Sequence, residues 1–324
     1  MPKSKLSLNA KTFALQEGVV YRSTGSWYWV KSSTGQFYDC RIKGKFRLKG
    51  IKHTNPIAVG DHVRFSLYTE GEDTKGTIEE ILPRENYIVR RSVNLSKQTH
   101  IIASNIDQAL LLITLNNPPT FFAFIDRFLI TAQAYQIPVI LIFNKMDTYT
   151  DDERAEVQWM KSIYEVLDYP CYDISCFDTK DIEKIDALMR GKVSMFSGHS
   201  GVGKSTLLNA LAPKLNLRTA EISAQHQQGQ HTTTYAEMFD LSDQVSIIDT
   251  PGIKGFGVVD MQPEELGNYF PEFYSLKGDC KFNNCLHVDE PHCAVKQAVE
   301  AEEIAPSRYD SYLQLLEEDT PYRN

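Results

Sequence analysis

One stretch of the chain has the residue types and spacing of a loop that binds phosphate groups. A strand-like run from Lys192 to Ser197 leads into a glycine-rich segment, and a helix-like run to Leu211 follows it. Glycines permit a tight loop whose backbone N–H groups surround phosphate oxygens, and the helix start adds partial positive charge. We expect Lys204 to reach the β- and γ-phosphates of a nucleotide and Ser205 to ligate Mg²⁺. The loop comprises Gly198, His199, Ser200, Gly201, Val202, Gly203, Lys204, Ser205 and Thr206.

A second segment, upstream of the loop, has the residue types that recognise guanine. The apolar run 139–143 ends in Asn144, Lys145, Met146 and Asp147. The Asp147 carboxylate can accept hydrogen bonds from N1–H and the 2-amino group of guanine, and adenine lacks both donors. We expect Asn144 to meet the purine edge and the stem of Lys145 to lie across the ring.

Two further segments supply the remaining contacts of a GTP site. Ser175 and Cys176 follow the next strand-like run, where we expect a backbone N–H to meet guanine O6. Asp249 ends the run 245–249 and can hold Mg²⁺ through water, and the N–H of Gly252 can reach the γ-phosphate. The guanine-recognising segment precedes the phosphate loop, the reverse of the usual order in GTPases. The sequence therefore predicts a circularly permuted GTPase.

The group that orients the attacking water departs from the pattern of Ras-type enzymes. Where those enzymes have a glutamine, this chain has Ile253, whose side chain cannot orient water. His231 is the nearest substitute, and together with Lys204 it is our catalytic candidate; a solvent-exposed loop histidine is an equally weighted alternative. We expect Thr233 or Thr234 to complete the Mg²⁺ shell, and the pattern does not choose between them.

A compact set of soft metal ligands lies near the carboxyl end. Cys280, Cys285, His287 and Cys293 stand within fourteen residues. Three thiolates and one imidazole form a closed tetrahedral shell for structural Zn²⁺, with no open position for chemistry. The spacing favours His287 over His292 only moderately. We expect one structural zinc that supplies folding energy to this small, polar segment.

Charge is distributed unevenly along the 324 residues, whose formal net charge is −8. Residues 1–100 hold 17 Lys and Arg against 9 Asp and Glu, whereas the remainder hold 17 against 33. A basic domain that meets a polyanion, attached to acidic domains, is the favoured interpretation. No apolar run is long enough for a membrane span or a signal peptide, so we expect a cytoplasmic protein with no membrane partner.

Short strand-like runs between residues 18 and 82 predict an OB-like β-barrel. They are separated by Gly, Asn, Asp and Pro, and no helical apolar period is visible. Every second residue of one stretch is basic, which we call the basic ridge: Arg41, Lys43, Lys45, Arg47 and Lys49. Alternation places such charges on one face of a strand, where they can follow RNA phosphates. A charged edge that guards against aggregation is the less favoured alternative.

From residue 105 onward the pattern becomes that of an α/β fold with a mostly parallel sheet. The expected strands cover 108–115, 139–143, 171–175, 193–197 and 245–249, and the expected helices cover 121–135, 152–167, 180–189 and 204–211. Short helices are expected at 294–301 and 307–318. We expect three domains: an RNA-binding barrel at 1–92, the permuted GTPase at 93–260 and a zinc-binding helical module at 261–324.

The assembled residues resemble the ribosome small-subunit-dependent GTPase A (RsgA/YjeQ) family over nearly the whole chain. The resemblance includes the permuted order, the phosphate loop, His231–Thr234, Asp249–Ile253, Tyr269–Phe273 and the Cys280 metal pattern. It implies a GTPase that acts late in small-subunit assembly, is stimulated by that subunit and is coupled to the departure of assembly factors. It also supports His287 as the fourth ligand and His231 as a catalytic residue. The chain departs from the family at Gln228 and Gln230, where arginines are common.

The resemblance also sets the expected partners and the alternatives. We expect a monomer that binds the small ribosomal subunit and its rRNA, with GTP or GDP, Mg²⁺ and one Zn²⁺ as cofactors. A permuted GTPase that serves the large subunit is a rival, which the barrel and zinc module disfavour. An RNA-binding scaffold that holds GTP as a structural ligand is a rival of another class, which Lys204, Ser205 and Asp249 disfavour.

Overall fold

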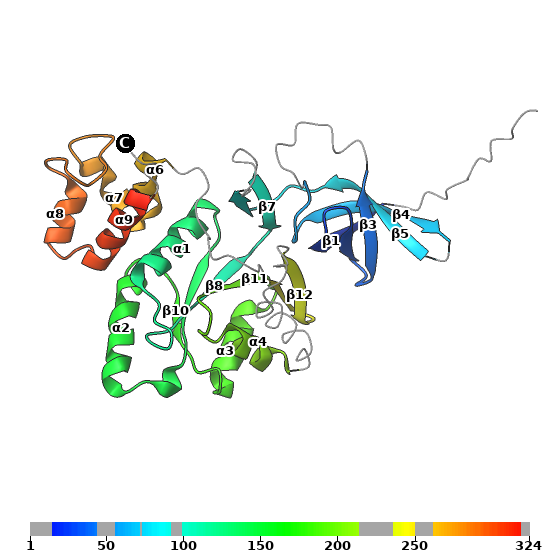
Figure 1. Ribbon diagram of the computed structural model, residues 1–324, viewed down its shortest axis with the longest axis horizontal. Helices are drawn as coiled ribbons and strands as arrows, with labels where there is room; N and C mark the ends of the chain where they lie inside the picture. The colour runs from blue at the N-terminus through cyan, green and yellow to red at the C-terminus, as the bar shows by residue number, and fades with distance from the viewer. Residues whose placement is uncertain are drawn as a thin grey trace, which may run out of the picture. The chain divides into compact units, whose positions relative to one another are not determined.

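The computed structural model of the chain describes residues 15–43, 56–71, 73–91, 99–213, 236–249 and 262–318 (Figure 1). Contacts among them define two compact units. The first gathers described residues of 1–105, 234–239 and 248–251, and the second gathers those of 106–233, 240–247 and 252–324. The three-domain division at residues 92 and 260 stays a prediction.

Five strands of the first unit close into a barrel. They are β1 (Gln16–Ser23), β2 (Tyr28–Ser32), β3 (Phe37–Ile42), β4 (His62–Glu70) and β5 (Asp73–Ile81). The pairing runs β1–β2–β3–β5–β4, and β4 pairs again with β1, so no strand edge is left within the ring. The predicted barrel is confirmed, and residues 44–55 of the predicted region lie outside the described residues.

Small residues let the barrel strands approach each other closely. A Cβ on Gly76 would collide with Cys40 Sγ and lie 3.2 Å from Phe65 Cδ2, so only glycine fits between these side chains. The core around it is apolar and buried: Val20, Tyr28, Val30, Cys40, Ile57, Val63, Phe65, Leu67 and Ile78. Burial raises the pKa of the Cys40 thiol to about 12, with a further contribution from Asp39. This cysteine is therefore a packing residue.

A hairpin follows the barrel in the chain. It consists of β6 (Tyr87–Arg91) and β7 (Thr99–Ser104), which pair antiparallel in a sheet of their own. Sequence patterning did not predict it. Its strands are short, and their separation exceeds the two to five residues of common hairpin loops.

The second unit is built on the α/β sheet predicted from residue 105 onward. Its strands are β8 (Gln108–Ile113), β9 (Val139–Phe143), β10 (Cys171–Asp173) and β11 (Lys192–Ser197), with residues 240–242 of β12 (Glu237–Ser242) and 245–247 of β13 (Val245–Asp249). The spatial order is β10-β9-β8-β11-β13-β12, and the pairs β10–β9, β9–β8 and β8–β11 are parallel. All residues of β8 and β9 are buried, as expected of central strands covered on both faces.

Four helices cover this sheet. They are α1 (Phe122–Ala134), α2 (Asp151–Glu165), α3 (Thr179–Met189) and α4 (Lys204–Leu211). In Figure 1, α1 and α2 lie on one side of the sheet and α3 and α4 on the other. A capping box between Thr150 and Glu153 stabilises the first turn of α2, a helix composed mainly of polar residues.

Short helices form the carboxyl-terminal part of the second unit. They are α6 (Pro263–Leu266), α7 (Pro271–Leu276), α8 (Ala294–Glu300) and α9 (Pro306–Glu318). Phe270, Phe273 and Tyr312 pack in one buried cluster with the three cysteines of the metal pattern and with Ile130 of α1. The cluster therefore joins these helices to the α/β core. No helix among the described residues is long and apolar enough to cross a membrane.

Candidate functional site

The phosphate loop lies between the end of β11 and the start of α4. Gly198, Gly201 and Gly203 have φ values of 141°, 88° and 104°, in the region that favours glycine. A Cβ on Gly198 would lie 2.7 Å from the carbonyl oxygen of Leu112. The loop thus keeps the strand-loop-helix context predicted for it, and its glycines are needed for the turn.

Lys204 begins α4 and folds back over the loop. Its ammonium donates to the carbonyl oxygens of Gly198 and, at 2.7 Å, of His199. The His199 ring lies against Phe124 of α1, with ring centroids 3.8 Å apart. Burial and the nearby Lys204 charge lower the pKa of His199, so this imidazole is neutral beside the ammonium. The positive charge beside His199 is therefore that of the Lys204 ammonium alone.

The guanine-type segment is bound directly to the phosphate loop. Asn144 Nδ2 donates to the carbonyl oxygen of Val202 at 2.8 Å, and the Cys176 thiol donates to Asn144 Oδ1 at 3.2 Å. A Cβ on Gly203 would collide with the same amide. Asn144 therefore locks three separate segments together. Its side chain is buried, and the contact expected with the purine edge stays a prediction.

Two backbone features orient the rest of the guanine-type segment. Lys145 has a left-handed φ of 68° and donates from Nζ to the carbonyl oxygen of Asn117. Met146 and Asp147 then enter a single 3₁₀ turn over Met146–Thr148. Asp147 is exposed, which leaves its carboxylate accessible to the nucleobase of a ligand.

The turn after β10 is fixed on both sides of Cys176. The N–H of Ser175 donates to Asp181 Oδ2 at 2.8 Å, and the N–H of Phe177 donates to Ser175 Oγ at 3.2 Å. Burial raises the pKa of the Cys176 thiol, which keeps this side chain neutral. A neutral, packed thiol next to Asn144 suits a positioning role and not a nucleophilic one.

Sequence reasoning missed one segment of this site, the loop 115–120 that follows β8. Asn117 accepts the Lys145 hydrogen bond, and Pro118 Cδ lies 3.3 Å from where a Cβ on Gly201 would stand. The N–H of Leu115 donates to the Tyr149 hydroxyl at 2.9 Å. The Asn-Pro-Pro turn was visible in the sequence, but nothing in its composition linked it to a nucleotide.

Several predicted site residues lie outside the described residues: Gly252, His231, Thr233, Thr234 and Ile253. Asp249 ends β13, the strand that neighbours β11 in the sheet. Ser205 and Thr206 lie in the first turn of α4. The phosphate loop and the segment from Asn144 to Asp147 thus follow β11 and β9, which lie parallel to β8 on either side of it. Carboxyl ends of parallel strands meet at one edge, the usual place of ligand sites in such sheets.

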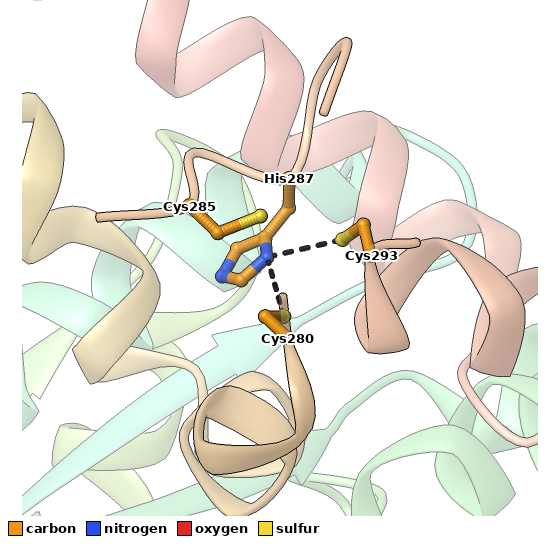
Figure 2. Close-up of side chains that lie close together, drawn as sticks. All are labelled: Cys280, Cys285, His287 and Cys293. Carbon is orange, nitrogen blue, oxygen red and sulfur yellow. Dashed lines mark hydrogen bonds between the residues drawn. The ribbon is translucent and has the colours of Figure 1, made fainter. Parts of the chain in front are cut away.

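The four predicted metal ligands come together at one point (Figure 2). One ligand atom from each of Cys280, Cys285, His287 and Cys293 lies within 4.8 Å of the others, and all four residues are buried. His287 Nδ1 lies 3.3 Å from Cys293 Sγ and 3.6 Å from Cys280 Sγ. These separations suit donors placed around one tetrahedral ion at about 2.0–2.3 Å from each. The group is therefore a possible zinc site.

The pKa shifts of Cys285 and His287 indicate how these two residues would bind a metal. Burial raises the pKa of Cys285 to about 12, and the neighbouring Cys293 and Cys280 add to the rise. The Cys285 thiol therefore needs a nearby cation before it loses its proton. Burial also lowers the pKa of His287, which keeps its imidazole neutral and able to coordinate.

A second layer of hydrogen bonds holds the loop that carries His287. Glu290 accepts from the N–H groups of Leu286 at 2.7 Å and Val288 at 2.9 Å. The hydroxyls of Tyr309 and Tyr312 on α9 donate to the carbonyl oxygens of His287 and Leu286, each at 2.6 Å. Such support fixes the orientation of a ligand before the metal arrives.

The order of elements defines the class of protein. β9 with its Asn-Lys-Met-Asp segment precedes β11 with its phosphate loop, yet both flank β8 in one sheet. This is the arrangement of a circularly permuted GTPase, preceded by a five-stranded barrel and followed by a Cys₃His cluster with helices.

Comparisons with known proteins agree with this class. The family profile described as RsgA GTPase matches residues 81–259, and the profile described as RsgA N-terminal domain matches residues 17–78. The small ribosomal subunit biogenesis GTPase RsgA of Christiangramia forsetii is 62% identical over 95% of this chain and 98% of its own length. The protein of the same name from Bacteroides fragilis is 52% identical over 95% of this chain and 99% of its own.

Two solved structures are similar over almost the whole chain. YjeQ from Thermotoga maritima superposes with a TM-score of 0.76 at 34% identity, and covers 96% of this chain and 100% of its own. YloQ, a circularly permuted GTPase, superposes with a TM-score of 0.73 at 28% identity and covers 95% and 97%. The chain belongs to the RsgA GTPase family, and it is a GTP hydrolase.

Proposed function

We propose that this GTPase acts as a late assembly factor of the small ribosomal subunit, binds its rRNA and hydrolyses GTP faster when the subunit is bound. The observation that carries the proposal is the joint presence of the barrel, the permuted GTPase core and the Cys₃His cluster in one chain whose relatives are named for small-subunit biogenesis. A permuted GTPase alone would leave the partner open. The two flanking parts supply the surfaces with which a large RNA–protein particle can be recognised.

The phosphate end of the nucleotide site is assigned to the loop from Gly198 to Thr206. Its N–H groups and the start of α4 bind the phosphates, and Lys204 moves from the loop carbonyls onto the β- and γ-phosphates. Ser205 and one of Thr233 and Thr234 ligate Mg²⁺, and Asp249 holds it through water. The N–H of Gly252 contacts the γ-phosphate.

The base end is assigned to Asn144, Lys145, Met146, Asp147 and the turn Ser175–Cys176. The exposed Asp147 carboxylate accepts both guanine donors, and the Cys176 N–H meets O6. Asn144 acts by joining the base end to the phosphate end through Val202. Selectivity for guanine then follows from a charged acceptor that adenine leaves unpaired.

The water-activating group is assigned to His231. It stands in the predicted first switch, and Ile253 cannot take the role of a glutamine. A site whose catalytic group is brought into position by the bound subunit would turn over slowly in isolation. This is the physical basis for stimulation by the subunit.

The barrel is assigned the contact with rRNA. Arg41 and Lys43 of the basic ridge are both exposed, as strand alternation predicts, and Lys45, Arg47 and Lys49 lie outside the described residues. The Arg41 guanidinium lies 3.8 Å from the centroid of the Trp27 ring, so the ridge continues into an aromatic surface. Basic and aromatic groups side by side suit the backbone and bases of RNA.

Turnover with and without the partner tests the proposal. GTP hydrolysis is measured under multiple-turnover conditions for the chain alone, with purified small subunits and with purified large subunits. We expect at least tenfold stimulation by small subunits only. Equal rates in all three reactions would overturn the assembly function, and stimulation by large subunits alone would favour the rival partner.

A further inference from the structure

A buried arginine joins the carboxyl-terminal helices to the α/β core. Arg308 of α9 is 1% exposed. Its Nη1 donates to Asp126 Oδ1 of α1 at 2.6 Å, and its Nε donates to Glu272 Oε1 of α7 at 2.7 Å. Asp126 is fully buried and also accepts from the Tyr164 hydroxyl of α2 at 2.9 Å. One guanidinium thus balances two carboxylates from two different parts of the fold.

The helix that carries Arg308 also contacts the segment 280–293, called the metal loop here because it carries the four possible ligands. Tyr309 and Tyr312 of α9 donate to the backbone carbonyls of His287 and Leu286. The metal loop and the buried arginine therefore share one rigid helix. A change in the metal centre that shifts α9 shifts the guanidinium as well.

The helix that carries Asp126 also contacts the phosphate loop. Phe124, two residues before Asp126 on α1, lies against the His199 ring at 3.8 Å between centroids. Lys204 in turn donates to the carbonyl oxygen of His199. Helix α1 therefore contacts Arg308 of α9 through Asp126, and it contacts His199 of the proposed phosphate site through Phe124.

We propose that Arg308 is a positioning residue that couples the metal centre to the nucleotide site. Asp126 is tolerated in the interior only while its counterion is in place, because an unpaired buried charge is strongly unfavourable. Loss of zinc loosens α9, withdraws the guanidinium and forces α1 to move, and Phe124 then releases His199 from its position. Zinc and nucleotide consequently bind more tightly together than separately, and this coupling is reciprocal. The inference rests on the proposed nucleotide site.

The coupling is measured as a ratio of affinities in the full chain. The Kd of a fluorescent GDP derivative is determined for zinc-loaded protein and for protein stripped by a chelator. Far-UV circular dichroism verifies that the α/β core stays folded. We expect stripping to weaken GDP binding at least about fivefold, the lower end of typical allosteric factors. Saturating GDP should raise the affinity for zinc by the same factor.

Variants then assign the coupling to the buried charges. The triple variant Arg308→Met, Asp126→Asn, Glu272→Gln removes every charge of the cluster while roughly preserving its volume, a change that folds tolerate. We expect it to bind zinc and GDP, with an affinity ratio below about twofold. Arg308→Lys keeps the charge but cannot reach both carboxylates as a fork, so it should restore part of the ratio. Arg190→Met, which removes an exposed pair with Asp186, is the matched control and should retain the full ratio.

Phe124→Leu provides a second test that leaves the buried charges intact. It removes the ring contact with His199 and should also lower the affinity ratio. A wild-type chain that binds GDP equally well with and without zinc would overturn the coupling alone. An unchanged ratio in both the charge-free and the Phe124→Leu variants would overturn the role of this path. Absence of GDP binding in both states would instead overturn the proposed nucleotide site.

Discussion

The phosphate loop (198–206) and the metal loop (280–293) are both short, but they are positioned by different means. Glycines recur in the first loop and cysteines in the second. The phosphate loop begins where β11 ends, β11 pairs with the fully buried strand β8, and the shape of the loop follows from three glycines and the sheet. The metal loop brings four possible metal ligands together, and hydrogen bonds from two tyrosine hydroxyls and to Glu290 support its backbone. The first is shaped by backbone geometry, and we expect the second to depend on a bound ion.

The two loops should therefore respond differently to substitution. The phosphate loop is anchored at the end of a strand, so it should keep its shape when one side chain is removed. Its variants should therefore change only nucleotide binding and catalysis. In the metal loop, removal of one ligand should change the local structure, because a tetrahedral ion then lacks one of its four donors and contributes less folding energy. Variants in each loop, and in the base-binding segment and the barrel, can test this division.

Removal of one metal ligand should have the greatest consequence. Cys285→Ser should reduce zinc from one ion per chain to a small fraction, because structural zinc sites contribute an apparent ~10–16 kcal/mol at neutral pH. Elemental analysis of protein purified without chelators measures the stoichiometry. Cys171→Ser, a thiol outside the cluster, should retain the ion. Absence of zinc from the wild-type chain would contradict the assignment.

Removal of the phosphate-loop lysine should come next. Lys204→Ala should slow GTP hydrolysis by on the order of 10²–10³, because the variant lacks a preorganised charge on the transferred phosphoryl group. The loop should keep its shape, since the glycines and the sheet define it. Single-turnover kinetics measure the rate, and exposed Lys180→Ala serves as the control. Wild-type rates in the Lys204 variant would show that the loop does not contact the reacting phosphate.

Nucleotide choice should depend on Asp147. Asp147→Asn removes the acceptor for two guanine donors and should weaken GTP binding by about 2–4 kcal/mol, while xanthine nucleotides bind relatively better. Direct titration with GTP and XTP measures the preference, and Asp151→Asn on α2 is the control. An unchanged preference would place the base elsewhere.

Neutralising the basic ridge should affect the isolated GTPase least. Replacing Lys43, Lys45 and Arg47 by Ala should weaken subunit binding and reduce its salt dependence by about one unit of slope for each phosphate that is no longer neutralised. Lys43 pairs with Glu79, so it should contribute least. Intrinsic GTP hydrolysis should be nearly unchanged. The matched control replaces three exposed basic residues of α3 and its carboxyl end, Lys180, Lys184 and Arg190. Equal salt slopes for the wild type and the ridge variant would show that the ridge does not bind RNA.

Much of this architecture could be predicted from the sequence because its signals are local. The phosphate loop needs glycine at fixed positions, and the Cys₃His spacing is chemically unusual. The central strands β8 and β9 carry apolar runs, whereas β12 was not predicted because Glu237, Asp240 and Ser242 interrupt its apolar residues. The predicted end of the first of these strands at 115 was too late, since Leu115 already binds Tyr149 in the loop.

Contacts between distant residues could not be predicted in this way. Arg308 and Asp126 are 182 positions apart, and an arginine or aspartate in an amphipathic helix normally indicates a solvated face. The role of Asn144 as a joint between segments likewise depends on Val202, 58 positions away. Such pairs are defined by helix packing and strand order, which emerge only when the whole sheet is assembled.

Affinity for the small subunit in two nucleotide states is the decisive test of a GTP-controlled assembly factor. Purified small subunits are titrated with the chain bound to a non-hydrolysable GTP analogue and, at the same salt concentration, with the chain bound to GDP. We expect tighter binding in the GTP-analogue state by about 1–3 kcal/mol, the usual size of such coupling. In the Asp147→Asn variant, the corresponding xanthine nucleotides should produce the same difference. Equal affinity in the two nucleotide states would contradict GTP-controlled binding to the small subunit.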